Sequence, residues 1–127
     1  MSPAPGQSHL RAATGMGEPA TRATFAYIDA LAIDAADNLY VGDSWRIRRI
    51  SPNGKISTFA GTGAYPGTTS NAGGPAASVG ICPGALAASN DTLFATDSCS
   101  PSIIAFSLDG TKSSVIGGNN GYGSSGD

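Results

Sequence analysis

Two cysteines are the residues of this chain whose type and spacing bear most directly on chemistry. If Asn90-Asp91 forms a two-residue turn, Cys82 and Cys99 face one another across a hairpin at a non-hydrogen-bonded position, where Cα atoms lie about 4.5 Å apart. That separation is within the range of a disulfide, so the spacing predicts a bond between them. Two free buried thiols are the alternative, because Pro83 and Gly84 can break the hairpin register.

Carboxylates are the second candidate for chemistry, and Asp34, Asp43 and Asp97 each stand at the end of an expected strand. Short acidic side chains at such positions commonly accept hydrogen bonds from turn backbone, which is the role we expect here. The one histidine, His9, lies in the N-terminal tail, so we expect no Ser–His or Cys–His pair for nucleophilic catalysis. Two cysteines without a nearby histidine are also an incomplete metal site, and we expect neither metal nor cofactor.

The only basic stretch is Trp45-Arg46-Ile47-Arg48-Arg49, with an aromatic residue at its head. Stacking on Trp45, together with the charge of Arg46, Arg48 and Arg49, makes these four residues the candidate binding surface. Alternation along a strand divides that charge between its two faces, and a solvated sheet edge is the alternative. Because the net charge of the whole chain is −2, we expect no nucleic-acid partner.

The elements that position these residues occur twice in the sequence. At a shift of 54 residues, "LYVGD" at 39–43 falls on "LFATD" at 93–97, and at a shift of 56 Phe59 and Gly61 fall on Val115 and Gly117. Short insertions and deletions at loop tips explain the change of shift. We therefore expect two structural repeats of about 56 residues each.

Each repeat is expected to contain four short strands. Asn53-Gly54 and Asp109-Gly110 stand between apolar runs and are strong hairpin signals, because these residues accept positive φ. The expected strands of the first repeat are 30–34, 39–43, 46–50 and 56–61, and those of the second are "ALAAS", "TLFATD", "SIIAF" and "SSVIGG". The sequence thus predicts an all-β chain of two four-stranded antiparallel units.

The string "LAIDAADNLYVGDSWRIRRISPNGKISTFAGTGAYPG", followed by "GGPA", resembles the NHL repeat in its long-loop bacterial form. The resemblance covers roughly residues 13–127 and implies blades of a β-propeller. Two departures stand out from the family pattern. Ser44-Trp45 replaces a longer Thr-Gly-Asn-Asn segment, and Ser102-Ile103-Ile104 replaces Arg-Ile-Arg in the second repeat.

The resemblance divides the chain into an N-terminal tail at 1–12, an NHL-like repeat at 13–71, and a second at 72–127 that includes the start of a further inter-blade loop. In the family five or six blades close a ring, whereas two blades form an incomplete ring with uncovered sheet faces. We therefore expect either a fragment of a longer propeller or self-association of this chain.

Loops that differ between the two repeats favour a non-catalytic module that binds a protein or a glycan, or that acts as a scaffold. The alternative is part of a metal-dependent, lactonase-like hydrolase or lyase whose site residues lie on missing blades. No segment is apolar enough to be expected to span a membrane. Asn90-Asp91-Thr92 is both a glycosylation sequon and a plausible hairpin tip, and with the cysteines it favours an extracytoplasmic setting.

Overall fold

The computed structural model describes residues 16–67 and 72–118. They form two antiparallel sheets, as the sequence predicts, with one additional strand and two 3-10 turns. The first sheet contains β1 (Met16–Pro19), β2 (Ile28–Ile33), β3 (Leu39–Asp43), β4 (Arg46–Ile50) and β5 (Lys55–Ala60), in the order β1-β5-β4-β3-β2. The second contains β6 (Pro83–Ala88), β7 (Thr92–Asp97), β8 (Ser102–Ser107) and β9 (Ser113–Gly118), in sequential order.

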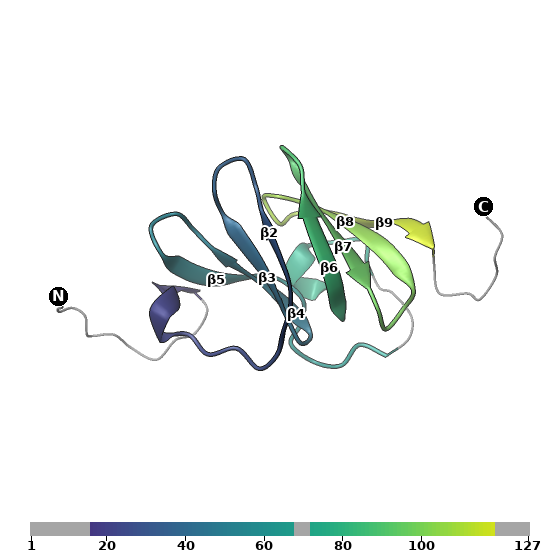
Figure 1. The fold of residues 1–127 in the computed structure, drawn as a ribbon. Helices are drawn as coiled ribbons and strands as arrows, with labels where there is room; N and C mark the ends of the chain where they lie inside the picture. Colours follow the sequence, from purple (N-terminus) through teal and green to yellow (C-terminus); the bar gives the residue numbers. More distant parts are fainter. Residues whose placement is uncertain (1–15, 68–71, 119–127) are drawn as a thin grey trace, which may run out of the picture.

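The two sheets meet at β2 and β6, which are the first strands that the sequence predicts for the two repeats. Strands β2 and β6 lie side by side in the middle of the molecule, and the remaining strands of each sheet extend away from them (Figure 1). The 3-10 turns are η2 (Ala20–Arg22), before β2, and η3 (Ala76–Ser78), before β6. Neither turn, in this described part of the chain, has the length or apolar character of a membrane-spanning helix.

The same backbone hydrogen bonds recur in both sheets, which supports the expected repeat. The amide of Ala20 donates to the carbonyl of Gly54 over 2.7 Å, and the amide of Ala76 donates to that of Gly110 over 2.9 Å. Both acceptor glycines sit in hairpin turns with positive φ, 84° and 78° respectively. The Asn-Gly and Asp-Gly signals therefore correctly located these turns, because glycine adopts such backbone without steric cost.

The alignment at a shift of 56 is wrong for the last strand of each sheet. Gly61 has a φ of 99° and Gly118 a φ of 66°, and an added Cβ on either would contact the equivalent backbone of the preceding strand. Gly61 therefore corresponds to Gly118, and Phe59 corresponds to Ile116 instead of Val115. The turn between β8 and β9 is one residue longer than that between β4 and β5. Residues after this turn therefore align with the first repeat at a shift that is one residue greater.

The core lies between the two sheets. Tyr40, Ile47 and Phe59 of the first sheet are buried there, and the rings of Tyr40 and Phe59 make an edge-to-face contact with centroids 5.2 Å apart. The second sheet contributes four buried residues to the same cluster, Leu93, Ala95, Ile104 and Phe106. Burial of these apolar surfaces is the main term that stabilises the contact between the sheets.

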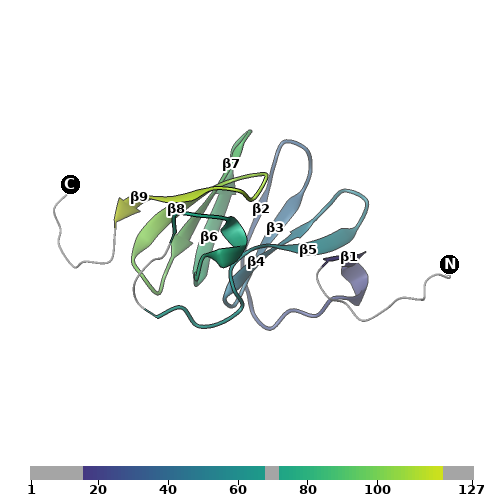
Figure 2. The same ribbon diagram turned by 180° about the vertical axis from the view of Figure 1, so that it is seen from behind.

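The long glycine-rich connection between β5 and β6 is part of this core. Its η3 turn lies between the sheets, as the view from behind shows (Figure 2). Ala76, Val79 and Ile81 of the connection are fully buried in the inter-sheet cluster. The part of this connection that follows residue 71 therefore packs into the core and contributes to the contact between the sheets.

Candidate functional site

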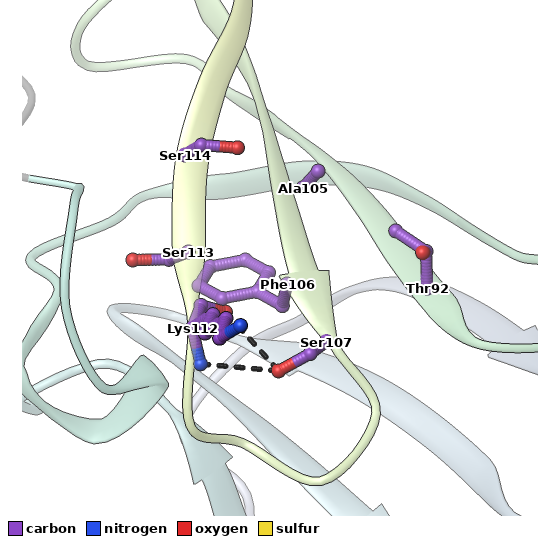
Figure 3. Close-up of a pocket in the computed structure, with 7 residues that line it drawn as sticks. All are labelled: Thr92, Ala105, Phe106, Ser107, Lys112, Ser113 and Ser114. Atoms are coloured by element: carbon purple, nitrogen blue, oxygen red, sulfur yellow. Dashed lines mark hydrogen bonds between the residues drawn. The ribbon is translucent and has the colours of Figure 1, made fainter.

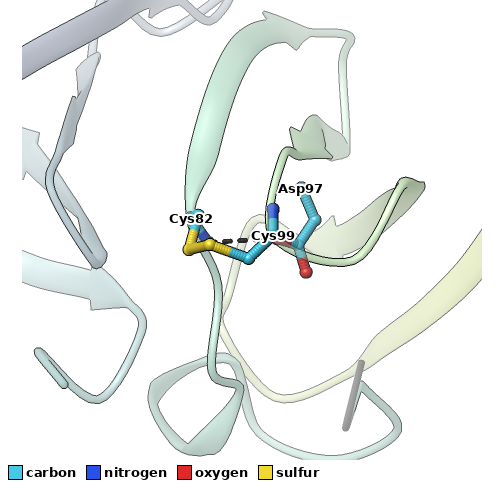
Figure 4. Close-up of side chains that lie close together, drawn as sticks. All are labelled: Cys82, Asp97 and Cys99. Atoms are coloured by element: carbon cyan, nitrogen blue, oxygen red, sulfur yellow. Dashed lines mark hydrogen bonds between the residues drawn. A yellow bond between two sulfur atoms is a disulfide. The ribbon is translucent and has the colours of Figure 1, made fainter. Parts of the chain in front are cut away.

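The two cysteines form a disulfide, as the sequence predicts. Cys82 and Cys99 are bonded, with their Cα atoms 5.5 Å apart (Figure 4). The expected register holds near the turn, where Ala88 faces Leu93, but it slips by a bulge before Leu86. The pairing survives because Cys82 lies just before β6, where the slip still leaves the two side chains within reach.

Asp97 lies against the disulfide and accepts hydrogen bonds from both of the chain segments that the disulfide joins. One carboxylate oxygen, Oδ1, accepts the backbone N–H groups of Cys82, Cys99 and Ser100 over 3.1–3.4 Å. The potential ligand atoms of Cys82, Asp97 and Cys99 all lie within 4.8 Å of one another. Both sulfur atoms are committed to the disulfide, however, and thiolates are what a metal would require. As it stands, this cluster is a structural crosslink.

Asp43 takes the same place in the first sheet. Its Oδ1 accepts the backbone N–H groups of Ala26 and Tyr27, each over 2.9 Å. Its Oδ2 is buried without a hydrogen-bond partner. We call Asp43 and Asp97, with the amides that they hold, the aspartate clamps.

Asp34 closes the turn between β2 and β3. Its carboxylate accepts the amides of Ala36 and Asn38, the Asn38 side chain, and the hydroxyl of Tyr40 over 2.9 Å. Burial raises the pKa of Asp34, but these hydrogen bonds outweigh burial and hold the pKa below its ordinary value. The expected role of Asp34, Asp43 and Asp97 in binding turn backbone is therefore confirmed.

The basic stretch does not form one open surface. Arg48 is buried and lies over the ring of Phe25, 5.9 Å from its centroid, and burial together with the charge of Arg46 lowers its pKa. Arg49 faces the second sheet and donates to the carbonyl of Leu108 over 3.1 Å. Arg46 is half-buried. Of the four candidate residues, Trp45 is the exposed one, and a binding role for Trp45 or Arg46 stays a prediction.

Trp45 belongs to a cluster of exposed aromatic residues at one end of the first sheet. Tyr27, Trp45 and Tyr65 are 68%, 40% and 59% exposed. The rings of Trp45 and Tyr65 meet edge to face with centroids 6.2 Å apart. We call these three residues the aromatic end. Sequence analysis missed both tyrosines, although an aromatic residue in each of three loops was a usable signal.

Backbone hydrogen bonds fix the loops that carry the aromatic end. The amide of Ser44 donates to the carbonyl of Tyr27 over 3.0 Å, and the amide of Gly63 donates to that of Trp45 over 3.3 Å. Gly61 allows close approach, because an added Cβ would lie 2.6 Å from the Trp45 carbonyl oxygen. Exposed rings on such constrained backbone lose little conformational entropy when they bind a partner.

Two further features lie at the opposite end of the second sheet. A shallow hollow at the β8–β9 turn is lined by Thr92, Ser107 and Lys112, and the Lys112 amide donates to the Ser107 hydroxyl (Figure 3). This hydroxyl is already engaged in the turn and offers no reactive group. Asn90 of the sequon is exposed at a hairpin tip. His9 lies outside the described residues.

Comparison with known proteins supplies no relative from which a role can be transferred. No family model matches the chain, and no curated protein is significantly similar to it in sequence. The functional argument therefore rests on the residues and geometry given above.

Proposed function

We propose that this chain is a non-catalytic binding module built from two β-propeller blades of the NHL type, whose aromatic end contacts a protein or glycan partner. Three features support the propeller: two equivalent sheets, adjacent inner strands β2 and β6, and a core that includes the connection between them. The NHL-like string in the first repeat supports the family.

The observation that carries the binding role is the exposure of Tyr27, Trp45 and Tyr65 on constrained loops. Tyrosine and tryptophan combine a large apolar face with a polar group, and they dominate contact energies at interfaces. Loops held by a rigid sheet are where proteins commonly place binding residues. The aromatic end combines both properties.

The carboxylates favour this proposal over a hydrolase whose metal is held by these two sheets. Asp34, Asp43 and Asp97 each accept backbone N–H groups through Oδ1. A metal that recruited them would compete with those bonds, and catalytic metals generally bind a preorganised set of ligands. Their role in the turns accounts for their positions.

Binding can be followed directly because Trp45 is the only tryptophan of the chain. We would screen soluble oligosaccharides and a peptide library by Trp45 fluorescence, then measure affinities by calorimetry. For a probe that binds, Tyr65→Ala and Trp45→Ala are each expected to weaken affinity about tenfold or more. Asn53→Ala, at the opposite end of the sheet, is the control and should leave affinity unchanged, as should a metal chelator.

Two outcomes would contradict the proposal. Affinity that is insensitive to both Trp45→Ala and Tyr65→Ala would exclude the aromatic end as the contact surface. Lactonase or esterase turnover that requires calcium or zinc and disappears in Asp43→Asn or Asp97→Asn would instead favour the hydrolase.

A further inference from the structure

Each sheet has one face that the other sheet does not cover. On the second sheet, Ile103 and Ile116 are 41% and 54% exposed. On the first sheet, Ile28, Leu31 and Ile33 are 52–59% exposed. Contiguous apolar surface of this kind commonly marks an interaction site. We call these surfaces the second-sheet face and the first-sheet face.

The second-sheet face is the structural equivalent of a surface that is buried in the first sheet. Gly42 pairs with Ile47 and Thr96 pairs with Ile103, so Ile103 occupies the position of Ile47. Ile116 likewise occupies the position of Phe59, as the Gly61–Gly118 correspondence requires. Phe94 occupies that of Tyr40. The three equivalents in the first sheet are all buried against the second sheet.

The first-sheet face is equivalent to the surface of the second sheet that covers Tyr40, Ile47 and Phe59. Leu31 pairs with Val41 and Leu86 pairs with Ala95, so Leu31 occupies the position of Leu86, which packs on the inter-sheet core. In the inter-sheet contact, the first sheet therefore supplies a surface equivalent to the second-sheet face, and the second sheet supplies a surface equivalent to the first-sheet face. The molecule still exposes the second-sheet face and the first-sheet face themselves.

The second-sheet face also has room for apolar side chains. The second-sheet face has an apolar hollow lined by Ala85, Ala87, Phe94 and Ile103, where small side chains leave room beside large ones. The protruding apolar side chains of the first-sheet face, such as Leu31, supply what such a hollow accepts. In the existing core, Pro83 of the second sheet lies against Gly42 of the first, and the equivalent positions in the proposed contact are Ile28 and Thr96.

We infer that a second copy of this chain is the partner of these faces, and that its first-sheet face docks on the second-sheet face of the first copy. The contact repeats the geometry of the inter-sheet core and thereby continues an interface that already exists in the molecule. It is head to tail, so every copy added presents a new face, and the assembly ends only by closing into a ring.

Complementation between two variants tests this contact. Leu31→Arg places a charge on the first-sheet face, and Ile116→Arg places one on the second-sheet face. By sedimentation velocity from about 1 µM to about 100 µM, the wild type should associate and each variant alone should remain a monomer. An equimolar mixture should form a 1:1 heterodimer and no larger species, because each variant retains the face that the other lacks.

Controls separate loss of contact from loss of folding. Asn53→Arg adds the same charge at an exposed hairpin tip and should associate as the wild type does. Circular dichroism and mapping of the disulfide verify the fold, and Ile103→Arg replaces Ile116→Arg if that variant does not fold. A monomeric wild type, or a mixture that stays monomeric, would overturn the inference. Its outcome does not depend on ligand binding at the aromatic end.

Discussion

The same corner of the two sheets is constructed in two different ways. In the first sheet, Ser44 donates its amide to Tyr27, and in the second, Ser98 donates its amide to Cys82. Cys82 thus corresponds to Tyr27 in the backbone, whereas a uniform shift of 56 residues would place it on Ala26. At this position one sheet exposes an aromatic ring, and the other is crosslinked to Cys99.

The turn that follows explains the difference. Two residues join β3 to β4, whereas four residues join β7 to β8, and Cys99 lies in the longer turn. The aspartate clamps are common to both corners. The comparison teaches that the two corners share the clamp, while the residues around it form a crosslink in one corner and an exposed aromatic surface in the other.

Removing the crosslink is expected to have the largest effect on stability. The disulfide joins residues 17 apart in sequence, and loop-closure entropy predicts that Cys82→Ala with Cys99→Ala lowers the free energy of unfolding by about 3 kcal/mol. Denaturant unfolding of the oxidised wild type and the double variant measures this difference. Reduced wild type should resemble the variant, and equal stability of all three would show that the crosslink is not needed.

Removing a clamp is expected to have the next largest effect. Asp97→Ala leaves the buried amides of Cys82 and Ser100 without this acceptor, and Asp43→Ala does the same to the partly buried amides of Ala26 and Tyr27, so each variant should lose about 2 kcal/mol. Because the disulfide and Asp97 hold the same segments, Asp97→Ala should be more damaging in the cysteine-free protein than in the oxidised one. The loss of unfolding free energy caused by Asp43→Ala should be the same with and without the two cysteines. Additivity at both clamps in double-mutant cycles would contradict this coupling.

The smallest effect is expected at the paired hairpin turns, where Asp109 corresponds to Asn53. Hydrogen bonds from the Thr111 side chain and amide and from the Ser107 hydroxyl lower the pKa of Asp109 to about 2. Since the pKa is lower in the folded state, the carboxylate stabilises the fold above pH 3.8, and this contribution is lost as the pH falls toward 2.

Asp109→Asn gives the second turn the residue of the first. The free energy of unfolding of this variant should fall less steeply than that of the wild type between pH 3.8 and about 2. Urea unfolding across this range measures the slopes. Identical slopes would mean that the turn contributes nothing to the acid sensitivity.

Local signals in the sequence were sufficient for the four strands of each repeat and the turns between them, but not for β1. Asn-Gly and Asp-Gly located the hairpins, and the same turn chemistry placed Cys82 opposite Cys99. What could not be predicted depends on single-residue differences in loop length. One extra residue after β8 moved Ile116 into the position of Phe59, and a bulge before Leu86 shifted the register near the cysteines.

The candidate site was harder to predict because burial is a tertiary property. Arg48 and Arg49 lie in a run that reads as a charged edge, yet one is buried and the other spans the two sheets. Tyr27 and Tyr65 are far from Trp45 in sequence, and only the folded loops bring all three to one end. Composition and alternation contain no information about such convergence.

The additional strand β1 makes the outer borders of the two sheets unequal. β5 has hydrogen-bonded neighbours on both sides, β4 and β1, whereas among the strands of the described residues β9 pairs only with β8. On its other side, within the described residues, the Ser113 hydroxyl contacts Gly73 and Gly74. Local opening of the native state should therefore begin at β9, and its amides should exchange with solvent deuterium well before those of β5.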